Sequence, residues 1–392
     1  MINPVNSAIY NLTVVNDVLK VLIAMESAIL SFGVIADTQF VDVDDEVTNE
    51  LAYVVKTNGE YVLQEVKEKS VRRYRQSLEI LKVACTDYGS FSGSSGEKLT
   101  FCMHLGDVID AKSGVHRENS FNECIQRVLE CIRPLQDSGI DWHFCVGNND
   151  VKAMTRECWF DSFSSPRFGC SPQKLYYEFS PLKGYRFIVL DPYDVSTILW
   201  SPPDYSKATS NGFENLQKFS SASCSDSNEE ALRILRDKSP SVFEGDWYKD
   251  IETRGLDIRF MPYNGKVGTD QVAWLHEILE RSDDDNEKVW IFSHLPIHEK
   301  VCRLDGLLWN YDELISILNS YSCVQAYFAG HDHDGGYVID NYGIHHVVPP
   351  APLECDKDQT SFGYVHIFEV HLIQAVYYYR LCFTYECATP IP

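Results

Sequence analysis

The sequence is poor in basic residues and has no paired-cysteine motif. Of its 392 residues, 34 are Lys or Arg and 57 are Asp or Glu, which gives a formal net charge of −23. This charge would repel a polyanion, so no nucleic-acid partner is expected. The 13 cysteines form no C-x-x-C pair, and several lie inside apolar runs. Cysteines scattered in this way favour reduced thiols in a cytoplasmic protein over a disulfide framework.

The sequence also lacks a membrane span and internal repeats. Residues 14–25 are rich in apolar side chains but are interrupted by Asn16, Asp17 and Lys20, and no basic segment precedes them. This stretch is too short and too polar to cross a bilayer, with a signal anchor as the minor alternative. We therefore expect residues 1–27 to be an amphipathic or disordered N-terminal extension, and we expect no membrane partner. Residues 28–392 are expected to form a single domain and a monomer.

Apolar runs of strand length alternate with amphipathic stretches of helical periodicity. The apolar runs predict strands at residues 28–36, 99–105, 142–146, 185–190, 289–292, 323–329, 343–348, 363–370 and 375–384. The amphipathic stretches predict helices at residues 65–84, 121–135, 229–236, 269–281 and 311–318, with Thr269 as an N-cap. Residues 42–59 are predicted to be a loop, and residues 151–260 a pocket-shaping elaboration. This alternation predicts an α/β fold in which a two-sheet β-sandwich is flanked by helices.

Polar residues that can ligate a metal stand where the apolar runs end. They are Asp37, Gln39, Asp107, Asn148, His294, His331 and His333. Open α/β sheets bind ligands at the carboxyl ends of their strands, so these residues are expected to share one edge. His331 and His333 are two residues apart, so in an extended segment both rings would point the same way. For single residues, a helix cap at Asp37 or solvated loop histidines would be ordinary alternatives.

This set offers oxygen and nitrogen ligands without a thiolate. Such a set suits Mn²⁺, Fe or Zn²⁺ and argues against a cysteine-type structural zinc site. Seven ligands are too many for one ion, but with one shared carboxylate they make two sites of about four ligands each. Two metals about 3.5–4 Å apart can clamp a phosphate and activate a bridging water.

The motif order Asp-x-Gln, Gly-Asp-x-x-Asp, Gly-Asn-Asn-Asp, Ser-His-x-Pro and Gly-His-x-His resembles the calcineurin-like metallophosphoesterases. Within that superfamily the chain is most similar to the manganese-dependent ADP-ribose/CDP-alcohol diphosphatases, across about residues 30–370. In the first motif, Gln39 stands where the superfamily usually has His. The stretches that carry the resemblance are residues 32–40, 72–74, 190–194, 293–297, 309–311, 330–337 and 362–366.

The resemblance implies hydrolysis of the phosphoanhydride of ADP-ribose and CDP-alcohols, such as CDP-choline, to a nucleoside monophosphate and a phosphorylated partner. It implies two divalent ions, with Mn²⁺ preferred over Fe, Zn²⁺ or Mg²⁺. One ion would be held by Asp37, Gln39, Asp107 and His333, and the other by Asn148, His294 and His331, with Asp107 bridging. Asp107 and Asn149 would be catalytic. The residues expected to bind substrate are Arg72, Asp110, Asn149 and Asp334.

Several alternatives stay open at this point. The family has a His where this chain has Asn149, and an amide cannot act as a general acid near neutral pH. The protein is therefore either a diphosphatase, another binuclear phosphoesterase (a cyclic-nucleotide phosphodiesterase or a phosphatase), or a catalytically weakened nucleotide or metal sensor. The basic residues 72–75 either hold phosphate or pair with nearby acidic residues. Residues 191–200 and 302–309 either wall a base pocket or pack in the core.

Overall fold

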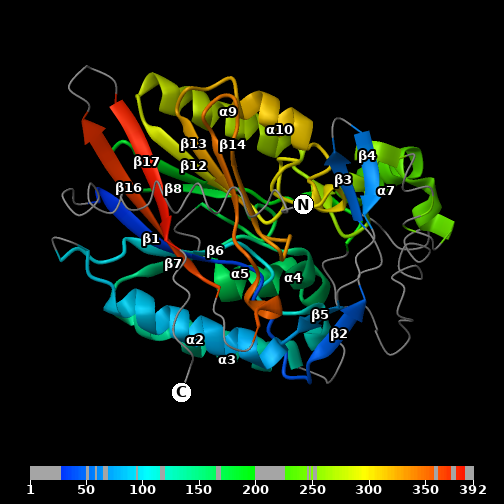
Figure 1. Ribbon diagram of the computed structural model, residues 1–392, viewed down its shortest axis with the longest axis horizontal. Helices are drawn as coiled ribbons and strands as arrows, with labels where there is room; N and C mark the ends of the chain where they lie inside the picture. The colour runs from blue at the N-terminus through cyan, green and yellow to red at the C-terminus, as the bar shows by residue number, and fades with distance from the viewer. Residues whose placement is uncertain are drawn as a thin grey trace, which may run out of the picture.

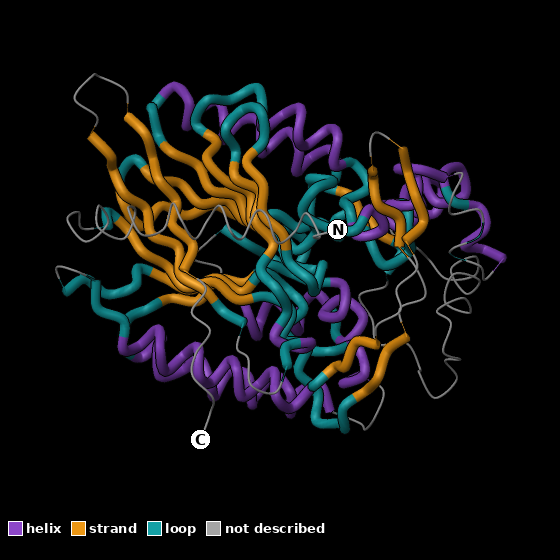
Figure 2. The backbone as a smooth tube through the Cα atoms, viewed as in Figure 1, coloured by secondary structure: helices purple, strands orange, loops and turns teal. Residues whose placement is uncertain are grey.

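The computed structural model describes residues 28–49, 53–57, 60–64, 69–93, 96–114, 120–164, 169–198, 226–244, 247, 249, 254–356, 361–371 and 377–384. Within these residues two β-sheets pack face to face, and helices cover the outer face of each sheet (Figure 1). Figure 2 shows the same layers, with the strands in the middle and helices above and below them. No helix in this described part is long and apolar enough to cross a membrane.

The first sheet has five strands, three of them parallel. Its strand order is β17 (Tyr377–Thr384), β16 (Gly363–His371), β1 (Leu30–Ile35), β6 (Phe101–His104) and β7 (Asp141–Phe144). Strands β1, β6 and β7 run parallel, whereas β16 pairs antiparallel with both β1 and β17. The carboxyl ends of β1, β6 and β7 therefore lie at one edge of the sheet.

The second sheet has six strands, four of them parallel. Its strand order is β14 (Gly336–Ile339), β15 (His345–Val348), β13 (Val324–Phe328), β12 (Lys288–Phe292), β9 (Tyr185–Val189) and β8 (Tyr177–Leu182). Strands β9, β12, β13 and β15 are parallel, and the edge strands β8 and β14 are antiparallel to their neighbours. Strands β12 and β13 end at the residues that precede the three predicted histidine ligands.

The core between the sheets is built from alternate residues of the strands. In β1, Phe32 and Val34 lie in the cluster between the sheets, whereas Ile35 lies in the cluster under the outer helices. The ring of Phe32 stacks on Phe101 of its own sheet, with centroids 4.7 Å apart, and meets Phe292 of the other sheet edge-on at 5.7 Å. This period of two buries both faces of the strand and explains why its sequence is continuously apolar.

Helices fill the outer layers and connect the parallel strands. Helices α2 (Tyr74–Ser90) and α3 (Ser120–Asp137) cover the first sheet, and α9 (Thr269–Asp284) and α10 (Tyr311–Leu318) cover the second (Figure 1). Tyr88 of α2 fits against Gly33 of β1, because a Cβ at Gly33 would lie 2.8 Å from its ring. The Tyr88 hydroxyl donates to the carbonyl of Val34 at 2.9 Å, which fixes the helix on the strand.

Smaller elements surround the strand ends. They are α4 (Asn148–Ala153), α5 (Arg156–Phe163), α7 (Asp226–Lys238), η1 (Ala111–Gly114), η4 (Pro240–Glu244), η5 (Gly255–Arg259), η6 (Leu304–Gly306) and η7 (Pro352–Glu354). Three two-stranded ribbons accompany them: β2 (Glu46–Asn49) with β5 (Lys69–Arg72), β3 (Tyr53–Thr57) with β4 (Glu60–Gln64), and β10 (Val195–Ser196) with β11 (Gly265–Lys266).

The structure confirms the predicted fold class and corrects some local assignments. Each predicted strand lies within two residues of an observed one at both ends, and the helix predicted at 311–318 is α10. The helix predicted at 65–84 is wrong at its start, because residues 69–72 pair with β2 as a strand. The loop predicted at 42–59 is also wrong, because β2 and β3 lie there. The N-cap of α9 is Gly268, and Thr269 is its first helical residue.

The predictions on chain organisation stay predictions, including that of a single domain at residues 28–392. Residues 1–27 lie outside the described part of the chain, so the N-terminal extension stays a prediction. The elaboration predicted at 151–260 also stays a prediction. Within that range, β8 and β9 belong to the second sheet, and α5 and α7 lie outside the two sheets.

Candidate metal centre

The loops after β1, β6 and β13 have unusual backbone conformations. In the described residues, five non-glycine residues have positive φ, and four of them are predicted ligands: Asp37 (48°), Gln39 (40°), Asp107 (54°) and His331 (72°). The left-handed region costs free energy for residues with a Cβ, and such conformations concentrate at functional sites. Among the described residues, these strained conformations therefore concentrate at predicted metal ligands.

The side chains of Asp37, Asp107 and His294 converge from three strands of the two sheets. Each offers one ligand atom, and these atoms all lie within 4.8 Å of one another. His294 Nε2 lies 3.6 Å from Asp107 Oδ1 and 4.0 Å from Asp37 Oδ1. All three residues are buried. Asn148 Oδ1 lies 3.2 Å from the same imidazole nitrogen and joins the group.

The tautomer of His294 shows that this group suits a cation. Its Nδ1 lies 2.8 Å from the carbonyl of Leu105, which can only accept, so Nδ1 carries the proton. In the neutral ring, Nε2 then presents a lone pair toward the oxygens of Asp37, Asp107 and Asn148. These atoms are all acceptors, and Asp37 Oδ1 is buried without a hydrogen-bond partner. A bound divalent ion would satisfy every one of them.

His333 and Gln39 approach the same place from the other side. His333 Nδ1 lies 2.6 Å from Glu354 Oε1, and its Nε2 lies 3.8 Å from Asp37 Oδ1. Gln39 Nε2 lies 2.9 Å from His333 Nε2 and donates to Asp107 Oδ2 at 3.1 Å. Ligation would need the amide oxygen, Oε1, which is buried and has no hydrogen-bond partner. A half-turn of the terminal amide exchanges the two atoms at little cost, because amide orientation is set by its partners.

His331 lies beside His294 at the edge of this group. Its backbone N–H donates to Asp37 Oδ2 at 2.9 Å, and its ring centroid is 5.1 Å from that of His294. Gly306 of η6 faces the ring, since a Cβ there would lie 3.3 Å from His331 Cδ2. Burial, followed by the neighbouring histidines, lowers the pKa of His331 well below its usual value. The ring is therefore neutral at physiological pH, which is the form that ligates metals.

The start of α4 holds Asp107 in place. The backbone N–H of Asn149 donates to Asp107 Oδ1 at 2.7 Å, and its side-chain Nδ2 donates to Oδ2 at 2.5 Å. Gly147 allows this approach, because a Cβ at that position would lie 2.1 Å from Asp107 Oδ1. Asp150 then accepts from the backbone N–H groups of Val108 and Ile109 at 2.9 and 3.2 Å, which fixes the loop after β6.

Two buried carboxyl groups at this centre have raised pKa values, because their burial is not offset by the positive charge near them. Burial raises the pKa of Asp37 to about 6, against the opposing effect of His294 and His333, and Asp107 raises it further. Burial, followed by Asp107, also raises the pKa of Asp150 well above its usual value. A cation at the centre would favour the charged carboxylates and reverse these shifts.

The structure places the predicted substrate-binding residues around this centre in different environments. Arg72 Nε pairs with Glu354 Oε1 at 3.3 Å. Asp110 is buried and accepts from the backbone N–H of Lys112 at 2.8 Å, whereas Asp334 is exposed. Their contact with a substrate stays a prediction. Arg73 and Arg75 pair with acidic side chains, so for these residues the acid-pairing alternative is correct.

Each of the two segments predicted to wall a base pocket, residues 191–200 and 302–309, contains a buried aromatic residue. Trp309 is buried in a cluster with Phe260, and its indole N–H donates to the carbonyl of Met261 at 3.2 Å. Tyr193 of the other segment is also buried, and its hydroxyl donates to Asn148 Oδ1 at 3.5 Å. Tyr193 therefore positions a predicted ligand from behind.

Sequence reasoning missed three residues near the site. Asp150 lies within the third motif, which could have revealed it. Lys152 lies one helical turn after Asn148, so the helical period places it on the same side of α4. Burial lowers the pKa of Lys152, and Asp107 and Asp110 oppose this effect, so these charges lie near one another. Glu354 follows no motif, and nothing local could have linked it to His333.

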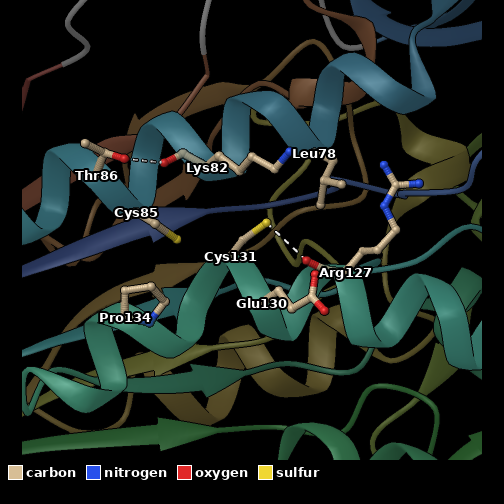
Figure 3. A pocket seen from close by; sticks show the side chains of 8 residues that line it. All are labelled: Leu78, Lys82, Cys85, Thr86, Arg127, Glu130, Cys131 and Pro134. Carbon is tan, nitrogen blue, oxygen red and sulfur yellow. Dashed lines mark hydrogen bonds between the residues drawn. The ribbon is translucent and has the colours of Figure 1, made fainter.

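A surface groove lies apart from these residues. It runs between α2 and α3, has a volume of about 320 Å³ and contains none of the predicted site residues (Figure 3). Its lining residues are Leu78, Lys82, Cys85, Thr86, Arg127, Glu130, Cys131 and Pro134. Since the two thiols have pKa values raised by burial, they are not activated nucleophiles.

Known proteins are similar to this chain over most of its length. A family profile described as calcineurin-like phosphoesterase matches residues 30–335. A protein of Oryza sativa subsp. japonica named manganese-dependent ADP-ribose/CDP-alcohol diphosphatase is 30% identical over 345 residues, covering 88% of this chain and 90% of the relative. A Xenopus laevis protein of the same name is 31% identical over 368 residues, covering 89% and 88%. The crystal structure of a dimetal phosphatase from Danio rerio matches with a TM-score of 0.67 and 26% identity, covering 87% of this chain and 94% of that chain.

Proposed function

This chain belongs to the calcineurin-like phosphoesterase family, among the manganese-dependent ADP-ribose/CDP-alcohol diphosphatases, and on that premise we propose that it hydrolyses the phosphoanhydride of ADP-ribose and CDP-alcohols. The products are a nucleoside monophosphate and a phosphorylated partner. The names of the relatives support this substrate class over cyclic nucleotides or phosphoproteins.

One observation carries the proposal. The His294 ring donates from Nδ1 to the carbonyl of Leu105 and directs Nε2 at oxygens of Asp37 and Asp107, with distances of 4.0 and 3.6 Å, inside the core. Asp37 Oδ1 is buried without a hydrogen-bond partner, and such an acceptor is unfavourable unless a cation joins it to its neighbours. The use of a divalent metal follows from this donor set and from the family.

We propose two divalent ions, with Mn²⁺ preferred and Fe, Zn²⁺ and Mg²⁺ as other candidates. Bound there, the ions would polarise the phosphoryl oxygens and lower the pKa of the water used for hydrolysis. The proposed ligands of the first ion are Asp37, Gln39, Asp107 and His333. The proposed ligands of the second are Asn148, His294 and His331, with Asp107 shared between the two.

The chain's own side chains then orient the reactants. Asn149 holds both oxygens of Asp107 and thereby fixes the shared carboxylate. Because an amide cannot release a proton at neutral pH, Asn149 would act as a hydrogen-bond donor to the substrate and not as an acid. Arg72, Asp110 and Asp334 are proposed to bind substrate. Lys152 of α4 adds positive charge close to Asp107, which favours an anionic ligand.

Product analysis tests the proposed function directly. The purified full chain is incubated with ADP-ribose and with CDP-choline, each with Mn²⁺ and with Mg²⁺, and the products are separated by chromatography. Release of AMP and CMP with Mn²⁺ is expected, and Asp107→Asn is expected to abolish it. Binding of ADP-ribose without AMP release would instead indicate the nucleotide or metal sensor that Asn149 makes conceivable.

The cytoplasmic location and the monomeric state remain proposals. In the described part of the chain ten cysteines are free thiols, and seven of these are buried. A reducing compartment maintains thiols in this state, which supports the cytoplasm. Size-exclusion chromatography with light scattering would measure the oligomeric state.

A further inference from the structure

We propose that Glu354 is a positioning residue that holds the ring of His333 with Nε2 directed at Asp37 and Gln39. The inference rests on the proposed function, because it concerns one of the two proposed metal positions. Glu354 is the last residue of the short helix η7, 21 positions after His333. The fold brings the two together, although no motif connects them.

The hydrogen bond to Glu354 selects the tautomer of His333. Glu354 Oε1 lies 2.6 Å from His333 Nδ1, and an ionised carboxylate can only accept, so Nδ1 is the protonated nitrogen. In the neutral ring Nε2 then carries the lone pair, and it faces Gln39 Nε2 at 2.9 Å and Asp37 Oδ1 at 3.8 Å. A carboxylate behind a ligating histidine fixes the ring orientation and makes its nitrogen a better ligand.

Glu354 is itself held by two side chains of β5. Ser70 Oγ donates to Glu354 Oε2, and Arg72 Nε donates to Oε1 at 3.3 Å. Its side chain is 14% exposed, so the carboxylate is largely shielded from water. Both oxygens are engaged, and the side chain has little freedom to leave the imidazole. The ribbon β2–β5 thus braces the metal site through Glu354.

The two proposed metal positions differ in how their histidines are oriented. His294 donates to the main-chain carbonyl of Leu105, which a side-chain substitution does not remove. His333 depends on the side chain of Glu354. A substitution of Glu354 should therefore weaken the ion held by Asp37, Gln39, Asp107 and His333 and spare the other ion.

Isothermal titration of the chelator-treated full chain with Mn²⁺ tests this. In Glu354→Gln one Mn²⁺ site should weaken by about 10–100-fold, which is the usual effect of losing such a partner. The second site should keep its affinity. In Glu354→Leu, whose side chain offers no acceptor to Nδ1–H, NMR of ¹⁵N-labelled histidine without metal should also show a loss of the Nδ1–H tautomer of His333. Ser70→Ala, a milder change in the same network, should give a smaller loss of affinity and keeps the test possible if Glu354→Gln unfolds.

Asp340→Asn is the matched control. Asp340 Oδ2 pairs with His346 Nε2 at 3.1 Å, which is the same kind of carboxylate–imidazole pair outside the proposed site. This variant should bind both ions as the wild type does. Two sites of wild-type affinity in Glu354→Gln, or an unchanged His333 tautomer in Glu354→Leu, would overturn the positioning role. Absence of divalent-metal binding by the wild type would overturn the proposed function itself and this inference with it.

Discussion

Asn149 donates two hydrogen bonds to Asp107, one from its backbone N–H at 2.7 Å and one from its side-chain amide at 2.5 Å. Each bond goes to a different carboxylate oxygen, so Asn149 determines how the proposed bridging ligand is oriented. The family resemblance expects a histidine at this position, which would be able to protonate a leaving group. Asparagine in place of this histidine therefore retains a hydrogen-bond donor but removes a group that could act as an acid.

The substitution Asn149→His should improve the cleavage of some substrates much more than others. A phosphate-ester leaving group has a second pKa near about 6, so it can depart from a pyrophosphate largely unprotonated. An alkoxide cannot, and general acid catalysis is worth about 10²–10⁴-fold. We expect a large gain in kcat on an alkyl phosphate monoester and a small gain on ADP-ribose. Steady-state kinetics on both substrates measure this, and an equal gain on the two would contradict it.

Divalent metal should stabilise the folded protein through Asp107. A ligand at 100 times its Kd raises the free energy of unfolding by about 2.7 kcal/mol. We expect a gain of this size for the wild type with Mn²⁺ and little gain for Asp107→Asn, measured by urea unfolding. In chelator the variant should be at least as stable as the wild type, because it removes a like charge beside the buried Asp37. A variant that gained as much from Mn²⁺ as the wild type would show that Asp107 is not a ligand.

The structure and the sequence agree best where a ligand follows a strand. Asp37, Asp107 and His294 were predictable because each stands directly after an apolar run, and parallel strands bring their carboxyl ends to one edge. The strands themselves were predictable because residues between two layers must be apolar on both faces. Gln39 was also predicted as a ligand. In the structure the atom of its side-chain amide that faces His333 is the nitrogen, Nε2, and not the oxygen.

Contacts between segments distant in sequence were not predictable. Glu354 reaches His333 through a turn that has no metal-binding pattern of its own. Residues 69–72 were assigned to a helix because they lie inside the amphipathic stretch at residues 65–84, but pairing with β2 overrides this local pattern. The sequence allowed Arg72 either to hold phosphate or to pair with an acidic residue. Its observed contact with Glu354 depends on the pairing of β5 with β2. In each case the contact depends on tertiary structure, which local sequence patterns do not reveal.

A glycine at the start of α4 should be indispensable for the site. A Cβ at Gly147 would lie 2.1 Å from Asp107 Oδ1 and 2.2 Å from the Asp107 nitrogen, so Gly147→Ala must displace the proposed bridging ligand. We expect a loss of Mn²⁺ binding and a destabilisation of about 1–3 kcal/mol, as for other overpacked positions. Calorimetric titration and urea unfolding measure the two effects.

Gly363→Ala is the matched control for Gly147→Ala. A Cβ at Gly363 would meet Val34 Cγ1 at 3.5 Å, which is an ordinary contact, and the position is buried like Gly147. This variant should keep Mn²⁺ affinity and most of its stability. Equal losses in both variants would mean that any added methyl group in this core disrupts the protein, and that Gly147 has no special relation to Asp107.

Stability should fall in acid because His104 is buried as a neutral ring. The Thr38 hydroxyl donates to the carbonyl of Val108 at 2.8 Å and so accepts from His104 Nε2–H at 3.1 Å. The N–H of Gly106 donates to Nδ1 at 3.2 Å, so neither nitrogen can take a further proton without losing a partner. Burial, followed by the nearby His294, lowers the pKa of His104 to about 3.

The sign of the effect follows from these pKa values. The unfolded chain binds a proton at His104 below about pH 6.5, and the folded chain does not until about pH 3. Protonation therefore favours the unfolded state across this window, at about 1.4 kcal/mol per pH unit, or about 2 kcal/mol between pH 7 and pH 5. In His104→Gln, whose amide can still donate to Thr38, the fall in unfolding free energy between these pH values should be smaller by that amount. Urea unfolding in chelator at both pH values measures it, and an unchanged difference in the variant would show that His104 is not the group responsible.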